Sequence, residues 1–519
     1  MSVALDQPGH KTQKLAIADP PPEPLIFVIF GATGDLTHRK LLPALYALAA
    51  AKRLPQEFGV VGVARREKAE EDYRQEMKDA VSKYALSPVS PEVLDSFAEK
   101  LHFCIGQFQD PAAYVGLKHE LEQLKKEIAT QGNVLFYLAT PPEFDEVIVE
   151  NLSHAGLLTE GGTKSPWTRV IFEKPFGHDL ASAIELNRSI HKHLREDQIY
   201  RIDHYLGKET VQNIMAVRFA NGILEPLWNR NYVDNIQITA AETIGIENRA
   251  TYYENAGALR DMVQSHLLQV FSLVAMEPPV SWSSKAIHDE KVKVLQAMDR
   301  LSGELVDAQT VRGQYGAGWV DGQPVPGYRQ EAGVSPDSNT DTFAALKLCV
   351  DSWRWGKVPI YLRTGKRLPR RATEVALTFK EPPQMLFRNT SAPIQADVLT
   401  MRIQPDEGVT LTLNSKVPGA GFRVQPVDLD FLYGQTFTGA VPEAYERLLV
   451  DAMRGDSTLF TRSDEVEEGW DIIQGVLDRW EGDPDAPAAD FPNYAGGSWG
   501  PYEATRLLEQ DGRRWRNPA

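Results

Sequence analysis

Apolar strands and amphipathic helices alternate between residues 25 and 172 of this 519-residue chain, and this alternation constrains the fold most. The apolar runs are rich in β-branched and aromatic residues, which is typical of parallel strands covered on both faces. Regular alternation of strand and helix predicts right-handed crossovers and a doubly wound parallel sheet. The strands are predicted at 25–30, 58–64, 101–105, 134–138 and 168–172.

Beyond residue 205 the predicted strands alternate apolar and polar residues, as antiparallel strands do. They lie at 233–243, 374–379, 398–403 and 409–413, among helices predicted at 251–276, 341–353 and 441–454 and a long loop over 312–340. We expect an α/β, Rossmann-like domain followed by an α+β domain with a large, mainly antiparallel sheet. The predicted divisions are a flexible arm (1–24), a cofactor-binding domain (25–203) and a substrate-binding and dimerisation domain (204–519).

Composition excludes several classes of partner. The formal net charge of −16 argues against a nucleic-acid or anionic membrane surface. No apolar run reaches the roughly 20 residues of a membrane helix, and the first residues lack the apolar region of a secretion signal, so we expect a cytoplasmic protein. The two cysteines, Cys104 and Cys349, form no paired motif and are expected to be small core residues, with no zinc site or disulfide.

A glycine turn follows the first predicted strand directly. Gly31 and Gly34 in G-A-T-G precede a helix, where backbone amides and the helix N-terminus suit a pyrophosphate. The spacing differs from G-x-G-x-x-G, and a tight turn without a ligand is the alternative. Arg65 and Arg66 end the second strand, where NAD enzymes carry an acidic residue; this favours the 2′-phosphate of NADP. A solvated arginine pair is the alternative, and the neighbouring Glu67 leaves NAD as a weaker cofactor.

Two further motifs indicate a site for an anionic substrate. Lys174, in E-K-P-F-G, follows the last strand of the first domain, at the sheet edge where ligands bind. R-I-D-H-Y-L-G-K at 201–208 supplies His204, Tyr205 and Lys208 as a candidate phosphate clamp. Asp203 is better suited to orienting a histidine than to contacting phosphate.

The histidine is expected from a later helix. His266 lies in an apolar stripe of the helix predicted over 251–276, so a buried core histidine is the alternative reading. The same helix carries Asp261, and Glu242 lies on a predicted strand before it; both suit a sugar site. A neutral imidazole oriented by a buried carboxylate is a suitable base for a sugar hydroxyl. No metal is expected, because a nicotinamide accepts the hydride.

These motifs resemble the glucose-6-phosphate dehydrogenase family over nearly the whole chain after the arm. The resemblance rests on G-A-T-G-D-L-T (31–37), F-Y-L-A-T-P-P (136–142), E-K-P-F-G (173–177), R-I-D-H-Y-L-G-K-E (201–209), R-D-M-V-Q-S-H-L-L-Q (260–269) and L-R-T-G-K (362–366). It implies oxidation of glucose 6-phosphate to the 6-phosphogluconolactone with NADP, the first step of the pentose phosphate pathway. It also implies a homodimer or homotetramer built through the large sheet.

The resemblance assigns roles residue by residue. His266 matches the family's general base, and Asp203 matches its partner. The implied substrate-binding residues are His204, Tyr205, Lys208, Glu242, Asp261, Lys366 and Lys174. The implied cofactor-binding residues are Gly31, Thr33, Gly34, Asp35, Leu36, Arg65, Tyr137 and Lys174.

Two alternatives and one departure accompany the resemblance. E-K-P also occurs in the glucose–fructose oxidoreductase group, which oxidises unphosphorylated sugars and polyols, but a neutral sugar needs no phosphate clamp. A non-catalytic NADP sensor is expected to have lost His266 or Asp203, and both are present. Animal members bind a second, structural NADP through basic residues after R-x-G-K. Ala372 and Ala376 stand where two of these are expected, which weakens the case for that second site.

Overall fold

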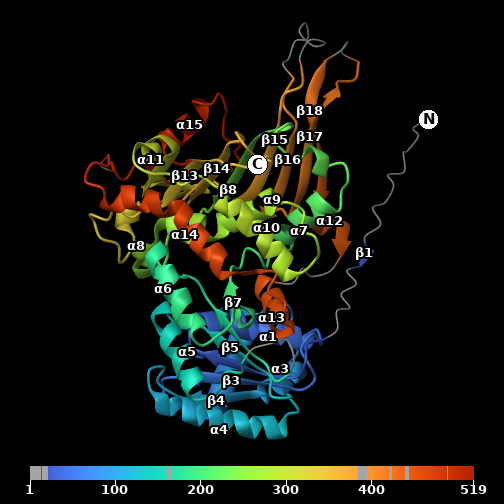
Figure 1. Ribbon diagram of the computed structural model, residues 1–519, viewed down its shortest axis with the longest axis vertical. Helices are drawn as coiled ribbons and strands as arrows, with labels where there is room; N and C mark the ends of the chain where they lie inside the picture. The colour runs from blue at the N-terminus through green and yellow to red at the C-terminus, as the bar shows by residue number, and fades with distance from the viewer. Residues whose placement is uncertain are drawn as a thin grey trace, which may run out of the picture.

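The computed structural model describes residues 13–14, 21–160, 165–383, 394–419, 423–438, 443–487 and 489–518. Within them, two large sheets of seven and eight strands dominate the molecule. Figure 1 shows the seven-stranded sheet in its lower half and the eight-stranded sheet in its upper half. No helix in these ranges is long and apolar enough to cross a membrane.

The lower sheet confirms the predicted parallel strands. Its order is β20-β7-β6-β5-β2-β3-β4, and every neighbouring pair is parallel except β20 with β7. The strands are β2 (Leu25–Phe30), β3 (Phe58–Ala64), β4 (Leu101–Ile105), β5 (Val134–Leu138), β6 (Thr168–Phe172), β7 (Ile199–Ile202) and β20 (Phe460–Thr461). The chain builds outward from β2 on one side and then returns to its other side with β5. This reversal leaves a crevice at the carboxyl ends of β2 and β5, the usual ligand position in such sheets.

Alternate residues of β2 face opposite helical layers. Phe27 and Ile29 pack in one core with the first group of helices, whereas Ile26 and Val28 pack in a second core with the other group. The period of two places every side chain of the strand in one core or the other, which explains its unbroken apolar sequence. The first group is α1 (Leu42–Ala50), α2 (Glu70–Tyr84) and α3 (Pro91–Ala98), and the second is α4 (Pro111–Glu127), α5 (Asp145–His154) and α6 (Leu180–His191).

The upper sheet has the order β18-β17-β16-β15-β8-β14-β13-β9, and it is antiparallel except where β14 pairs with β8. One face packs against α7 (Glu209–Phe219) and α9 (Leu268–Ala275), which share its main core. The strands are β8 (Val233–Ala241), β9 (Thr310–Gly313), β13 (Phe343–Leu348), β14 (Ile360–Gly365), β15 (Ala372–Phe379), β16 (Val398–Gln404), β17 (Gly408–Lys416) and β18 (Val424–Leu432).

Three sequence expectations were wrong here. The helix predicted over 341–353 is strand β13, because a short apolar run buried on both faces cannot be distinguished from a buried helix by periodicity. The long loop predicted over 312–340 contains the short strands β10 (Tyr315–Gly316), β11 (Gly318–Val320) and β12 (Gln323–Val325). Cys104 and Cys349 are free thiols but only partly buried, so neither is a core residue.

The C-terminal part of the chain returns to the lower sheet. Strand β20 pairs with β7, and α13 (Ala444–Arg454) packs on α1. The buried Arg201 of β7 donates to Glu196 Oε1 at 2.8 Å, and that oxygen also accepts from the backbone amide of Ser463 at 2.9 Å. The predicted boundary at 203/204 therefore stays a prediction. Residues far beyond it, in β20 and α13, pack on the lower sheet.

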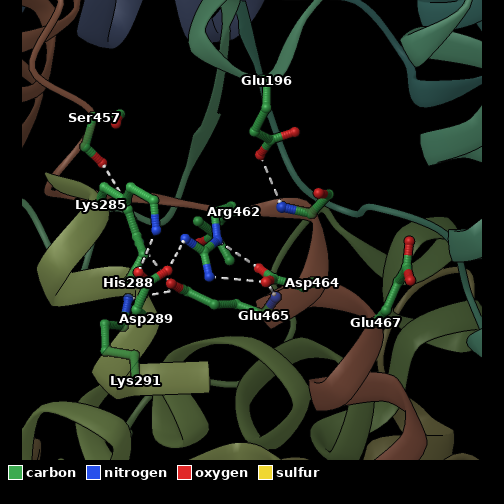
Figure 2. A network of polar contacts seen from close by, with 12 residues as sticks. Glu196, Lys285, His288, Asp289, Lys291, Ser457, Arg462, Asp464, Glu465 and Glu467 are labelled. Carbon is green, nitrogen blue, oxygen red and sulfur yellow. Dashed lines mark hydrogen bonds and ion pairs between the residues drawn. The ribbon is translucent and has the colours of Figure 1, made fainter. Parts of the chain in front are cut away.

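A buried charge cluster stabilises this return. Glu465, at the start of α14 (Ser463–Leu477), lies between His288 and Lys291 of α10 (Ser284–Gln296) (Figure 2). His288 Nδ1 and Lys291 Nζ contact its two carboxylate oxygens at 2.6 Å and 2.8 Å. Helix α14 contacts both α6 of the lower domain and η5 (Leu259–Leu267), a π-helix. The cluster therefore anchors a helix that joins the two parts of the molecule.

Candidate active site

The glycine turn after β2 forms the floor of a cavity. Gly31 has a φ of +83°, and a Cβ there would lie 2.3 Å from the carbonyl oxygen of Ala139. The amide of Gly34 and the hydroxyl of Thr37 both donate to the carbonyl of Gly31, at 2.9 Å and 3.0 Å. Only glycine therefore fits this turn. The cavity holds about 280 Å³ and is lined by Gly31, Thr33, Gly34, Ala64, Arg65, Arg66, Phe108, Ala139, Thr140 and Pro141.

Some predicted cofactor residues line this cavity and others do not. Gly31, Thr33, Gly34 and Arg65 do. The other four are not among its lining residues. Asp35 forms a surface ion pair with Arg39, Leu36 packs against the core, Tyr137 is fully buried and donates to Glu173, and Lys174 contacts Asp261 and His266.

His266 and Asp203 meet although 63 positions separate them in the sequence. Asp203 follows the end of β7, and His266 lies on η5. Nδ1 of His266 donates to Oδ1 of Asp203 at 2.5 Å, and the side chains are 1% and 3% exposed. Nζ of Lys174 donates to Nε2 of the same ring at 2.9 Å. Because an ammonium only donates, Nε2 is an acceptor and the ring is neutral.

Burial and charge set the protonation states of this pair. Burial lowers the pKa of His266, and Lys174 acts in the same direction against the opposing effect of Asp203. Burial alone would raise the pKa of Asp203, but His266, then His204 and Lys174, hold that pKa well below its usual range. Tyr205 stacks on the imidazole with ring centroids 4.3 Å apart. The result is a neutral imidazole beside a fixed carboxylate, which is the arrangement of a general base and its orienting partner.

Lys174 links this pair to Asp261. Its Nζ donates to the carbonyl and to Oδ1 of Asp261, both at 2.9 Å, and Tyr252 donates to the same Oδ1 at 2.9 Å. Burial opposes ionisation of Asp261, but Lys174 holds the pKa of this carboxyl well below its usual range. Asp261 is therefore an ionised hydrogen-bond acceptor that shares the Lys174 ammonium with the histidine.

Glu242 and Lys366 form a second polar pair. They directly follow the parallel strands β8 and β14, whose last paired residues are Ala241 and Gly365. Lys366 Nζ donates to Glu242 Oε2 at 2.7 Å, and the amide of Lys366 donates to the carbonyl of Thr342 at 2.9 Å. Two strands that end together thus bring side chains 124 positions apart into contact.

The three predicted phosphate residues form a compact group. Lys208 Nζ lies 3.8 Å from the centroid of the Tyr205 ring, and the rings of His204 and Tyr205 are 5.2 Å apart. Burial lowers the pKa of His204 well below its usual value and lowers the pKa of Lys208 to about 8. A dianionic group next to Lys208 favours the charged ammonium.

Two residues of this group were missed from the sequence. Gln404 Oε1 accepts from Lys208 Nζ at 2.9 Å, and the charge of Arg371 acts with burial to lower the pKa of Lys208. Arg371 lies in R-L-P-R-R, directly after the L-R-T-G-K motif, and that clustering was the available signal. Gln404 ends strand β16 and is positioned only by the sheet, so its sequence carried no signal.

Asp203, His204 and His266 also bring potential metal ligands within 4.8 Å of one another. The Lys174 ammonium contacts Nε2 of His266 at 2.9 Å, however, so a metal ion there would adjoin a positive charge. The donor set suits proton transfer better than metal binding.

A parallel sheet with a glycine turn, an antiparallel-sheet domain and a buried His–Asp pair near their junction define a two-domain NAD(P)-binding dehydrogenase. The chain belongs to the glucose-6-phosphate dehydrogenase family. Residues 28–213 match the family model "Glucose-6-phosphate dehydrogenase, NAD binding domain", and residues 215–516 match "Glucose-6-phosphate dehydrogenase, C-terminal domain".

Relatives extend over nearly the whole chain. The glucose-6-phosphate 1-dehydrogenase of Chlamydia pneumoniae is 49% identical over 497 residues, covering 95% of this chain and 96% of that protein. The Bacillus subtilis enzyme is 44% identical over 492 residues, covering 95% and 98%. A solved glucose-6-phosphate dehydrogenase in complex with its substrate superposes with a TM-score of 0.87 at 34% identity, covering 96% of this chain and all (100%) of that one. The Mycobacterium avium structure gives 0.80 at 38% identity, covering 96% and 99%.

Proposed function

We propose that this protein oxidises D-glucose 6-phosphate at C1 to 6-phospho-D-glucono-1,5-lactone and transfers the hydride to NADP⁺, as the first step of the oxidative pentose phosphate pathway. The observation that carries the proposal is the neutral His266, hydrogen-bonded to Asp203 at 2.5 Å and adjoined by the cationic group around Lys208. Family membership supports the activity.

His266 is the general base of this proposal. Its Nε2 takes the proton of the C1 hydroxyl, so the substrate must replace Lys174 as the donor to that nitrogen. Asp203 keeps Nδ1 protonated and stabilises the imidazolium that forms. Lys174, already hydrogen-bonded to Asp261, is then free to contact the sugar. The nicotinamide, when bound, accepts the hydride that leaves C1.

The remaining residues bind the two ends of the substrate. Asp261, Glu242 and Lys366 are proposed to hold the sugar hydroxyls, since Asp261 is a buried acceptor that shares Lys174 with His266, and Glu242 is a partly exposed acceptor paired with the buried Lys366. His204, Tyr205 and Lys208 are proposed to bind the phosphate. Partial burial makes each charged contact with phosphate stronger than it would be in water.

NADP is the proposed cofactor, with NAD as a weaker alternative. Arg65 and Arg66 are exposed at the carboxyl end of β3 and line the cavity over the glycine turn. That position faces the ribose 2′ group in dinucleotide-binding sheets, and guanidinium groups suit a phosphate there. Arg65 also lies 6.0 Å from the centroid of Phe108, which supports its orientation toward the cavity.

We further propose that the protein is cytoplasmic and forms a homodimer or homotetramer through the upper sheet. The two free thiols support a reducing compartment. Strand β18 lies at the end of the sheet and carries Leu429, which is 57% exposed. The outer strand of a sheet can be covered by a second copy, and Leu429 would then be buried.

The test measures absorbance of the reduced nicotinamide with glucose 6-phosphate and then with glucose, each with NADP and with NAD. Robust turnover of the phosphate ester with NADP and little turnover of glucose is the expected result. Preference for glucose would favour an unphosphorylated-sugar dehydrogenase, and binding of NADP without turnover would favour a non-catalytic sensor. Either result overturns the proposal.

A further inference from the structure

The helix that carries Asp261 and His266 is capped by a residue from another part of the chain. Helix η5 begins at Leu259 after Ala258, whose side chain offers no cap. Asp341 supplies one instead: its Oδ2 accepts from the amide of Leu259 and its carbonyl accepts from the amide of Ala258, both at 2.9 Å. Asp341 is only 8% exposed and lies two residues before β13.

The backbone before the helix is shaped around this carboxylate. Gly257 has a φ of +64°, a conformation that favours glycine, and it kinks the backbone near the end of α8 (Ala250–Ala258), two residues before η5 begins. A Cβ at Gly257 would lie 2.4 Å from Oδ1 of Asp341. Both the backbone angle and the close carboxylate therefore require glycine at position 257. The backbone just before η5 thus packs directly against the Asp341 carboxylate.

The same segment also supports the other side of the sugar pocket. Thr342, the next residue, accepts from the amide of Lys366 at 2.9 Å, and Lys366 pairs with Glu242. Three residues beyond Ala258, Asp261 contacts Lys174 at 2.9 Å. The adjacent residues 341 and 342 therefore connect the start of η5 to the Glu242–Lys366 pair through backbone and side-chain hydrogen bonds.

We propose that Asp341 is a positioning residue of the active site. Its carboxylate, which comes from a distant segment of the same chain, caps η5 and so fixes where Asp261 and His266 meet the sugar. Asp341 touches neither the reacting atoms nor the residues assigned to the phosphate. An anion at a helix N-terminus satisfies free amides and favours the helix dipole, so removal of its charge loosens the first turn. The inference rests on the proposed function, because it assigns a role within that same site.

The environment of Asp341 makes its charge sensitive to pH. Burial raises the pKa of Asp341 to about 6, and the Leu259 amide opposes that shift. Above this pH the cap is ionised, and below it the carboxyl becomes neutral and the anionic cap is lost. The charged and titratable groups that influence Asp341, or are influenced by it, are Glu481, Arg260, Arg312, Tyr253, Tyr328 and Tyr494. Burial lowers the pKa of His266 below its ordinary value, so two groups of the site, the cap and the base, become protonated on the acid side.

The experiment compares the wild-type enzyme with Asp341→Ala and Asp341→Asn. Asp110→Asn serves as the matched control, because Asp110 caps the distant helix α4 through Ala112 at 3.0 Å. For Asp341→Ala we expect kcat/KM for glucose 6-phosphate to fall about tenfold, with the Kd of NADPH unchanged. Asp341→Asn keeps the size and one acceptor oxygen but no charge, so its loss should be smaller. Its acid limb in kcat/KM should be less steep than that of wild type, because Asp341 no longer titrates and only His266 still does.

Several results would overturn the inference. They are an unchanged kcat/KM in Asp341→Ala, an equal loss in the Asp110 control, or an acid limb in Asp341→Asn that coincides with wild type. If Asp341→Ala fails to fold, the pH profile of Asp341→Asn still decides the question. Wild-type turnover is measured first, since its absence contradicts the proposed function and not the cap. In that case amide hydrogen exchange at Leu259 decides: faster exchange in the variants supports the cap, and unchanged exchange refutes it.

Discussion

Replacing Asp203 by asparagine removes one charge from the site and leaves its shape nearly intact. Oδ1 accepts from both His266 Nδ1, at 2.5 Å, and the amide of Tyr205, at 2.9 Å, so the amide oxygen of the variant should occupy this position. Oδ2 is buried and has no hydrogen-bond partner among the described residues, so the new NH₂ group falls there. The histidine should therefore keep its tautomer and lose only the neighbouring negative charge.

The structure sets the size of the effect. Two unit charges about 4 Å apart interact by about 4 kcal/mol at an effective dielectric constant of about 20. A neutral amide retains part of the hydrogen bond, so we expect a loss of about 3–4 kcal/mol in stabilisation of the imidazolium, or about 10²–10³ in the rate of hydride transfer.

The assay is single-turnover formation of NADPH from glucose 6-phosphate, measured by stopped flow across a pH series. The carboxylate raises the pKa of His266, so in the variant that pKa should fall further and the acid limb should move to lower pH. Equilibrium binding of NADPH and of glucose 6-phosphate controls for folding. A rate within about threefold of wild type, with an unshifted acid limb, would refute the idea that the Asp203 carboxylate stabilises the protonated His266.

Three further predictions concern other parts of the molecule. Lys208→Ala should raise KM for glucose 6-phosphate about 10–100-fold and change turnover of glucose little, because a charge-assisted bond to phosphate is lost; equal losses for both sugars would contradict this. Arg65→Ala should raise KM for NADP about 10–100-fold and leave NAD kinetics nearly unchanged, and steady-state kinetics with both cofactors checks it. Glu465→Gln should lower the free energy of unfolding by about 3–5 kcal/mol, since His288 and Lys291 lose their buried counter-ion. Burial would raise the pKa of Glu465, but Lys291 and His288 lower it to about 2. In urea unfolding, the excess stability of wild type over the variant should therefore be complete above the ordinary carboxyl pKa and be lost as the pH falls towards 2.

The sequence was sufficient where a local pattern decides the structure. Strand β2 is apolar at every position because both faces of the sheet are covered, and this pattern predicted its place. Strand β13 has the same character, yet it was predicted as a helix because flanking apolar residues extended the run. The burial of both faces is a property of the assembled sheet, and no local period reports it.

The site divides in the same way. R-I-D-H-Y-L-G-K and the helix of His266 were each recognisable, and the structure brings Asp203 and His266 together. Gln404 and Asp341 were not predicted, because each contributes through a contact across the fold and neither belongs to a recognisable motif. Tyr137 was expected to touch the cofactor, but the pleat of β5 turns it into the core.

The proposed reaction depends on His266, which is proposed to remove the proton from the C1 hydroxyl of glucose 6-phosphate. The direct test is single-turnover hydride transfer by His266→Asn, together with the Kd of glucose 6-phosphate for that variant. We expect a rate about 10²–10⁴ lower with substrate still bound, because an amide cannot accept the proton near neutral pH. Near-normal hydride transfer by His266→Asn would show that another group removes the proton.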